Sequence, residues 1–141
     1  WTRVLPNLPV IAPCDSIETA AAVAWAACYP GPVFLRLSRV GVPDLLPEGH
    51  TFELGRANLL RDGSDLTLIA NGTLTHRMVK AAEILAARGI EARVLNMATV
   101  RPIDIEAVVA AARETGAILT AEEHSVYGGL GSADHTAGFP A

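Results

Sequence analysis

Apolar residues fall into three short continuous runs between residues 65 and 122. The runs occupy residues 66–70, 92–97 and 117–121, and the first and last contain no charged side chain. Runs of this length with few charges are typical of parallel β-strands that are covered on both faces. We therefore predict three buried strands in this half of the chain.

Two segments between these runs repeat apolar residues at helical spacing, at residues 75–88 and 104–115. Gly89 and Gly116 follow them, where a helix often ends in the left-handed conformation. The alternation of strands and helices predicts an α/β fold, with an open, mostly parallel sheet and helices on both faces. Ligands bind such sheets at the carboxyl ends of the strands.

The N-terminal part of the chain predicts one more strand–helix–strand unit. Residues 9–12 and 33–38 have strand composition, and the alanine-rich residues 18–28 between them have helix composition. Asp15 precedes this helix and Glu18 follows three residues later, which is the spacing of a capping box. We interpret the unit as the tail of a second α/β domain that precedes the first.

A segment rich in proline and glycine separates the two units and shows no sustained periodicity. We therefore divide the chain into the end of one domain at residues 1–39, a linker at 40–52 and an incomplete C-terminal domain at 53–141. The two domains are expected to have separate sheets. This division places every predicted strand on one side of the linker or the other.

The strand predicted at residues 53–60 is followed by Asp62 and Gly63 and then by the strand at 66–70. Aspartate followed by glycine favours a hairpin turn. The first strand of the C-terminal domain is therefore expected to lie antiparallel at the edge of the sheet, next to residues 66–70.

Composition narrows the classes of function. Half of the 141 residues are hydrophobic, the net charge is −4, and no run of lysine and arginine is present, which argues against nucleic acid as a partner. No apolar run is long enough to span a bilayer. Cys14 and Cys28 do not have the spacing of a zinc motif or a disulfide framework, so we expect reduced thiols in a cytoplasmic protein. Because the chain begins at Trp1 rather than at a methionine, we expect a piece of a longer chain.

Arg36 and Arg39 lie at the carboxyl end of the strand predicted at residues 33–38. A guanidinium group in that place suits a phosphate, because its planar fork donates two hydrogen bonds at once. The alternative is a surface arginine paired with a carboxylate, and the residues alone favour that alternative.

Glu122, Glu123, His124 and Ser125 follow the strand predicted at residues 117–121. They could exchange protons with a substrate, or they could form a hydrogen-bonded corner or a subunit contact. No nucleophile is paired with them, so the structural interpretation is favoured. The glycine-rich turn at residues 128–132 matches no phosphate-binding spacing, and close packing of a helix start is its favoured explanation.

A polar turn follows the strand at residues 66–70. Within it we predict Thr73 or Thr75 as the cap of the next helix, and His76 as an exposed residue of the first turn rather than a ligand. None of these candidate groups makes a complete active site.

Several stretches together resemble the transketolase family. Residues 55–72, 92–104 and 120–133 are similar to the start, middle and later part of the transketolase C-terminal domain. Residues 5–7, 13–15 and 31–39 are similar to the end of the pyrimidine-binding domain. The Leu-Ser-Arg and Glu-Glu-His-Ser sequences favour transketolase itself, especially its short C-terminal subunit encoded by a split gene.

This resemblance implies an enzyme that uses thiamine diphosphate and Mg²⁺ to move a two-carbon ketol unit between sugar phosphates, as in the pentose phosphate pathway. The family's catalytic glutamate and its metal-binding domain match no part of this chain, so the resemblance implies no catalytic, cofactor-binding or metal-binding residue here. It also implies no cofactor bound by this segment alone. Arg39 matches the family arginine that contacts the substrate phosphate, which makes Arg39 the predicted substrate-binding residue.

The implied partners are a second copy of the chain, or the N-terminal half that binds thiamine diphosphate. Within the superfamily, deoxyxylulose-phosphate synthases and the β-type components of 2-oxo-acid dehydrogenases share the same layout and remain alternatives. A non-catalytic module that serves assembly is the alternative from another class.

Overall fold

The computed structural model describes residues 1–125 and 127–133. Its strands are β1 (Val10–Ile11), β2 (Phe34–Leu35), β3 (Asn58–Arg61), β4 (Leu66–Ala70), β5 (Ala92–Asn96), β6 (Thr99–Arg101) and β7 (Ile118–Ala121). Its helices are α1 (Ser16–Cys28), α2 (Thr75–Ala86) and α3 (Ile105–Glu114), with short 3-10 turns η1 (Thr2–Val4) and η2 (Gly72–Leu74). Residues 130–133 begin a further helical turn, and the predicted end of the C-terminal domain, residues 134–141, lies outside the described residues.

The larger sheet has four strands in the order β3-β5-β4-β7. β4 pairs in parallel with β5 on one side and with β7 on the other, while β3 pairs antiparallel with β5. The predicted α/β class with an open, mostly parallel sheet is thus confirmed.

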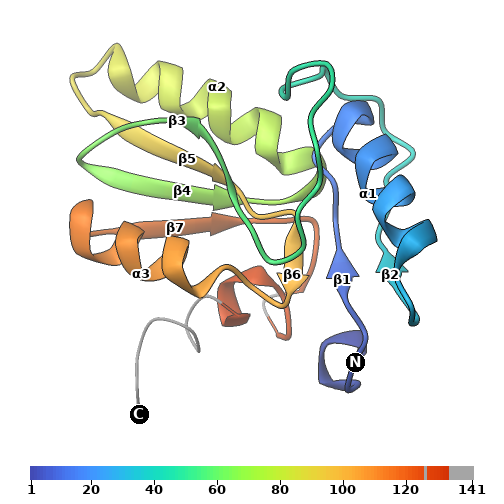
Figure 1. Cartoon of the computed structure of the whole chain (residues 1–141). Coiled ribbons are helices and arrows are strands. Elements are labelled where there is room, and N and C mark those ends of the chain that lie inside the picture. Colours follow the sequence, from blue (N-terminus) through green and yellow to red (C-terminus); the bar gives the residue numbers. More distant parts are fainter. Residues whose placement is uncertain (126, 134–141) are drawn as a thin grey trace.

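Successive side chains of these strands point to opposite faces of the sheet, and both faces are buried. Leu68 and Val94 pack in one hydrophobic cluster with residues of α2, and Ile69 and Leu95 pack in another with residues of α3. Figure 1 shows α2 and α3 on opposite sides of the strands. Burial on both faces explains why the strands of this sheet carry few charges.

The predicted hairpin between β3 and β4 is wrong. β3 lies at the edge and antiparallel, as expected, but its partner is β5 rather than β4. Both edges of β4 are occupied by parallel neighbours, so β3 has no place beside it. The turn at Gly63 therefore passes close over the start of β5, where a Cβ atom on Gly63 would lie only 2.5 Å from the backbone nitrogen of Arg93.

Gly63→Ala is expected to lower the free energy of unfolding by about 1–3 kcal/mol, because the added methyl group forces the turn away from the β5 backbone. Gly41→Ala is the matched control, since a Cβ atom there would meet no atom of the described residues within 4 Å. Urea unfolding of both variants measures the difference. Equal stability of the two variants would show that β3 reaches β5 without a close crossing.

The expectation of separate sheets on either side of the linker is also wrong in one respect. Two sheets are present, but the smaller one has the order β2-β1-β6 and takes β6 from beyond the linker. The chain leaves β5 through Met97 and Ala98, both of which are buried, and Ala98 accepts a hydrogen bond from the Ala12 backbone at 2.7 Å. This short buried crossing carries the chain to β1, where β6 pairs antiparallel.

Both predicted glycine helix ends are confirmed, and so is the Asp15 half of the predicted capping box. The Asp15 side chain caps α1 by accepting a hydrogen bond from the Glu18 backbone at 2.7 Å. Gly89 and Gly116 have φ values of 77° and 69° after α2 and α3, as a left-handed helix end requires. These caps set where the helices begin and end.

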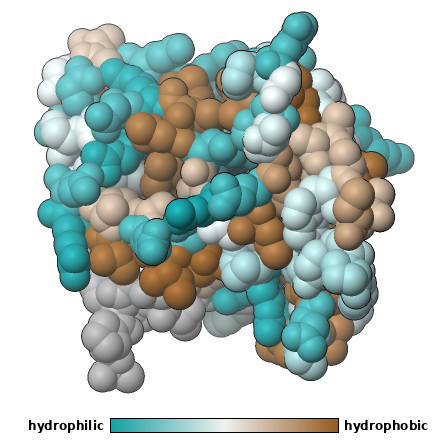
Figure 2. All heavy atoms as spheres, viewed as in Figure 1, coloured by the Kyte–Doolittle hydropathy of each residue, from teal (hydrophilic) through white to brown (hydrophobic). Residues whose placement is uncertain are grey.

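Figure 2 shows hydrophilic residues interspersed with several separate hydrophobic groups on the face seen in Figure 1. No helix within the described residues has the length and apolar character needed to cross a membrane. Cys14 is buried and Cys28 is exposed, and the structure contains both as free thiols.

Candidate functional site

The ends of strands β1, β2, β4 and β7 bring polar residues together at one place. A cavity of about 210 Å³ there is lined by Pro13, Arg36, Leu37, Ser38, Asn71, Gly72, Thr73 and Glu123. The Gly72 backbone donates a hydrogen bond to the carbonyl oxygen of Ala12 at 3.1 Å, which ties the end of β4 to the end of β1. The structure thus gathers three of the predicted candidate groups where an open α/β sheet binds ligands.

Arg36 joins three of these strand ends. Its backbone donates to the carbonyl oxygen of Ile11 at 2.8 Å, and its guanidinium donates to Asn71 Oδ1 at 2.5 Å. The same guanidinium forms an ion pair with Glu122 at 3.2 Å, in which the arginine side chain is 27% exposed and the carboxylate 9%. For Arg36, the alternative of an arginine paired with a carboxylate is therefore correct.

Arg39 has different surroundings. It is exposed and makes no hydrogen bond or ion pair with any of residues 1–125 and 127–133. It lies in an irregular segment after β2, in which the Val40 backbone donates to Ser38 Oγ at 3.1 Å. The Arg39 guanidinium is therefore accessible to a ligand, while Arg36 is held by the protein.

Glu122 stands at the centre of a hydrogen-bonded corner. Besides its ion pair with Arg36, its Oε1 accepts a hydrogen bond from the backbone of Leu130. Gly129 lies so close to this carboxylate that a Cβ atom would collide with it, which supports close packing as the reason for the glycine-rich turn. His124 is exposed, and its one side-chain hydrogen bond within the described residues is to the neighbouring carbonyl of Ser125, so Glu122 and His124 form no acid–base pair with each other.

The predicted cap of α2 is wrong. The 3-10 turn η2 continues directly into α2, so the N-cap residue Leu74 is already helical and makes no side-chain capping hydrogen bond. The Thr75 hydroxyl instead donates to Asn96 Oδ1 at 3.4 Å, and His76 is half-buried with its Nδ1 2.6 Å from the carbonyl oxygen of Thr73. In the cavity, Asn71 Nδ2 and Thr73 Oγ1 are buried and have no partner among the described residues.

The most connected buried group is Glu18, whose part in tertiary structure the sequence analysis missed. Its side chain is fully buried and accepts two hydrogen bonds from Asn96 Nδ2, at 2.8 and 2.9 Å, and one from Asn58 Nδ2 at 3.0 Å. It also accepts one from the Cys14 backbone at 2.8 Å, rather than from the Asp15 backbone as a capping box requires. Glu18 thus ties α1 to β3 and β5.

Burial is the main cause of the pKa shifts of Glu18 and Cys14. Burial raises the pKa of the Glu18 carboxyl, and the hydrogen bonds from Asn96 and Cys14 oppose that shift. Burial also raises the pKa of the Cys14 thiol, and the nearby Glu18 and Asp15 carboxylates raise it further. Cys14 is therefore a protonated thiol at neutral pH and not an activated nucleophile.

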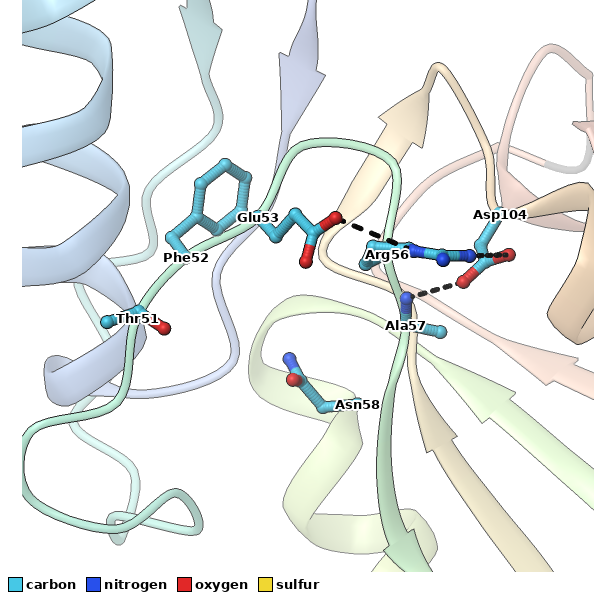
Figure 3. A pocket seen from close by; sticks show the side chains of 7 residues that line it. All are labelled: Thr51, Phe52, Glu53, Arg56, Ala57, Asn58 and Asp104. Carbon is cyan, nitrogen blue, oxygen red and sulfur yellow. Dashed lines mark hydrogen bonds and ion pairs between the residues drawn. The ribbon is translucent and has the colours of Figure 1, made fainter.

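A second cavity, of about 330 Å³, lies between the linker and the start of α3. Figure 3 shows the Arg56 side chain between Glu53 and Asp104. Arg56 forms ion pairs with Glu53 at 3.6 Å and with Glu106 at 2.9 Å, while Asp104 accepts a hydrogen bond from the Ala57 backbone at 2.9 Å. The charged side chains that line this cavity are thus paired with one another or with the backbone.

A metal ion needs several ligating side chains in one place. Within residues 1–125 and 127–133, no group of three or more His, Cys, Asp or Glu side chains is placed to hold a metal ion.

A family model described as "Transketolase, C-terminal domain" matches residues 55–134. The chain belongs to the transketolase family. It is 46% identical over 131 residues to "6-deoxy-6-sulfo-D-fructose transketolase subunit SqwH" of a Clostridium species, covering 93% of this chain and 41% of that protein. It is also 44% identical over 137 residues to "1-deoxy-D-xylulose-5-phosphate synthase" of Thermomicrobium roseum, covering 94% of this chain and 22% of that protein.

A solved structure described as "Split gene transketolase, inactive beta4 tetramer" is similar with a TM-score of 0.94 and 49% identity. The similarity covers 96% of this chain and 45% of that one. The fold is therefore that of a transketolase C-terminal region. This chain spans less than half the length of the relatives that it matches.

Membership places the chain in a family of transferases that depend, in general, on thiamine diphosphate. The family model begins at residue 55 and leaves Arg36 and Arg39 outside it, while the relatives match almost the whole chain. The strand-end cavity thus combines residues from the transketolase C-terminal domain with residues that precede it.

Proposed function

We propose that this chain is the C-terminal part of a transketolase-like enzyme that transfers a two-carbon ketol unit between sugar phosphates. The observation that carries the proposal is Arg39, an exposed arginine without a protein partner among the described residues, in the segment that follows β2. Sugar phosphates carry a dianionic group that a guanidinium fork grips well. We assign Arg39 to that phosphate.

The thiamine diphosphate and Mg²⁺ sites are proposed to lie in a separate N-terminal half. The described residues form no cluster suited to a metal ion, and Glu18, the most buried carboxylate, is fully engaged in holding α1 to the larger sheet. This chain supplies substrate binding and assembly. We place the domain boundary at residues 40–52, with the pyrimidine-domain end before it, and the complete enzyme in the cytoplasm.

The partner is proposed to be that N-terminal half, in a dimer or a larger hetero-assembly. One relative is named as a transketolase subunit, and the similar solved structure is described as a split-gene transketolase, which supports a chain that works with another. The turn after β7 would contact this partner, since His124, Ser125 and Tyr127 are exposed, and Tyr127 is 86% exposed.

A second candidate is deoxyxylulose-phosphate synthase activity. The relative with that name is 44% identical to this chain, and the relative named as a transketolase subunit is 46% identical, so identity does not separate the two activities. Both activities would use a phosphorylated sugar or aldehyde, so the role of Arg39 is the same in each.

The test is reconstitution with the N-terminal half, thiamine diphosphate and Mg²⁺. We expect ketol transfer from a ketose phosphate to an aldose phosphate, with no activity from either half alone. Formation of deoxyxylulose phosphate from pyruvate and glyceraldehyde 3-phosphate would favour the second candidate. Micromolar binding of thiamine diphosphate by this chain alone, in titration calorimetry, would contradict the proposed division of labour. If an assembled complex catalysed neither reaction, the chain would be an assembly module.

A further inference from the structure

We propose that Arg36 and Glu122 are positioning residues that hold Arg39 in place for a substrate phosphate. Glu122, which follows β7, would then affect substrate binding indirectly, through the two arginines that follow β2. The inference rests on the proposed function, because it takes Arg39 as the residue that contacts the phosphate.

The segment that carries Arg39 is held mainly at its two ends. Residues 37–43 contain no helix or strand, and the hydrogen bond from the Val40 backbone to Ser38 Oγ is local to the segment. At the far end, Asp44 accepts a hydrogen bond from the Ser16 hydroxyl at 2.6 Å, and the Asp15 carboxylate accepts one from the Leu45 backbone at 2.8 Å. At the near end, the last anchored residue before Arg39 is Arg36.

The near anchor combines the Arg36 backbone, which donates to the carbonyl oxygen of Ile11 at 2.8 Å, with the Arg36 side chain. β2 has two residues and pairs with β1 alone, so its own ladder holds the chain weakly. The guanidinium reaches across to Asn71 after β4 and to Glu122 after β7, which fixes the end of β2 against the larger sheet.

Glu122 is itself rigidly placed. Its side chain is nearly buried, its second oxygen accepts the Leu130 backbone hydrogen bond, and Gly129 packs against it. An ion pair gains from such preorganisation, because little side-chain entropy is lost when it forms. The contact is therefore expected to fix the position of Arg36, which lies three residues before Arg39, and with it the direction in which the chain leaves β2.

The experiment uses the reconstituted enzyme with the Glu122→Gln variant. Glutamine keeps an oxygen to accept the Leu130 hydrogen bond but removes the charge that holds Arg36. We expect KM for a phosphorylated acceptor to rise roughly three- to tenfold, as for coupled neighbouring residues. The kcat at saturating substrate and the kinetics with an unphosphorylated acceptor should change by less than about twofold. Arg36→Lys, which keeps the charge but not the two-pronged bridge, should act in the same direction.

The matched control is Glu91→Gln. Glu91 pairs with Arg61 at 2.7 Å, and it lies at the opposite ends of the strands, before β5. Loss of this pair should leave both acceptors unaffected. If Glu122→Gln prevents assembly, Arg36→Lys decides the question in the same assay.

A double-mutant cycle separates positioning from a general structural effect. In an Arg39→Ala background, Glu122→Gln should raise KM no further, because the residue through which it acts is absent. The same rise in both backgrounds, or an equal rise for both acceptors, would overturn the inference. If Arg39→Ala raised KM equally for the two acceptors, the phosphate role of Arg39 would be wrong. If Arg39→Ala did distinguish them and Glu122→Gln did not, the positioning inference alone would fail.

Discussion

Glu18→Ala is expected to lower the free energy of unfolding by about 3–5 kcal/mol, since it leaves several buried donors without an acceptor. The fully buried carboxylate accepts hydrogen bonds from the side chains of Asn58 and Asn96 and from the Cys14 backbone. Alanine removes all of them at once and leaves a cavity beside Asn96, which is itself fully buried. Chemical denaturation of the purified protein measures the loss.

Two other variants make this result interpretable. Glu83→Ala removes a carboxylate from an exposed position of α2 and should change stability by less than about 0.5 kcal/mol. Glu18→Gln keeps the size of the side chain and one acceptor oxygen, so its loss should fall between those of the two alanine variants. If Glu18→Ala were no more harmful than Glu83→Ala, the tie between α1 and the larger sheet would contribute little.

The larger sheet could be predicted because its sequence signal is local. β4 and β7 are short apolar runs without charge, and α2 and α3 show one apolar face each, so pattern alone locates them. Gly89 and Gly116 mark the ends of the helices before β5 and β7 and adopt the positive φ values that glycine allows.

The partner strands of β3 and of β6 could not be predicted in the same way, because the choice of partner depends on which strand edges are free. The Asp62–Gly63 pair favours a hairpin locally, but both edges of β4 are taken by parallel neighbours that come later in the chain. β6 has three residues and pairs with β1, which lies far away in sequence. No periodicity in so short a segment indicates a partner.

Part of the candidate site was accessible from the sequence. The carboxyl ends of the strands, with Arg36, Glu122 and the polar turn after residues 66–70, were identified as candidates, since this is where α/β sheets bind ligands. Which arginine is held and which is accessible depends on the reach of the Arg36 side chain to Asn71 and Glu122. The role of Glu18 in joining α1 to β3 and β5 could not be predicted, because the spacing of Glu18 from Asp15 is already explained locally as the start of a helix.

The reconstituted enzyme should lose affinity for phosphorylated substrates when Arg39 is replaced. Arg39→Ala is expected to raise KM for a phosphorylated acceptor by roughly ten- to a hundredfold, since a charge-assisted fork to phosphate is worth about 1.5–3 kcal/mol. At saturating substrate kcat should fall less than kcat/KM, because a contact with a remote phosphate is present in both the ground state and the transition state. Arg39→Lys should recover part of the loss, since it keeps the charge without the two-pronged geometry.

Steady-state kinetics with a phosphorylated and an unphosphorylated acceptor measure this effect. Arg77→Ala is the control, because Arg77 is an exposed arginine of α2 whose side chain has no hydrogen-bond or ion-pair partner among the described residues. It removes the same charge from another surface, so a general effect of net charge on anionic substrates would appear in both variants. A selective loss in Arg39→Ala assigns the phosphate to that side chain. An equal loss with the two acceptors would instead make Arg39 a structural residue, and the phosphate contact would have to be sought in the N-terminal half.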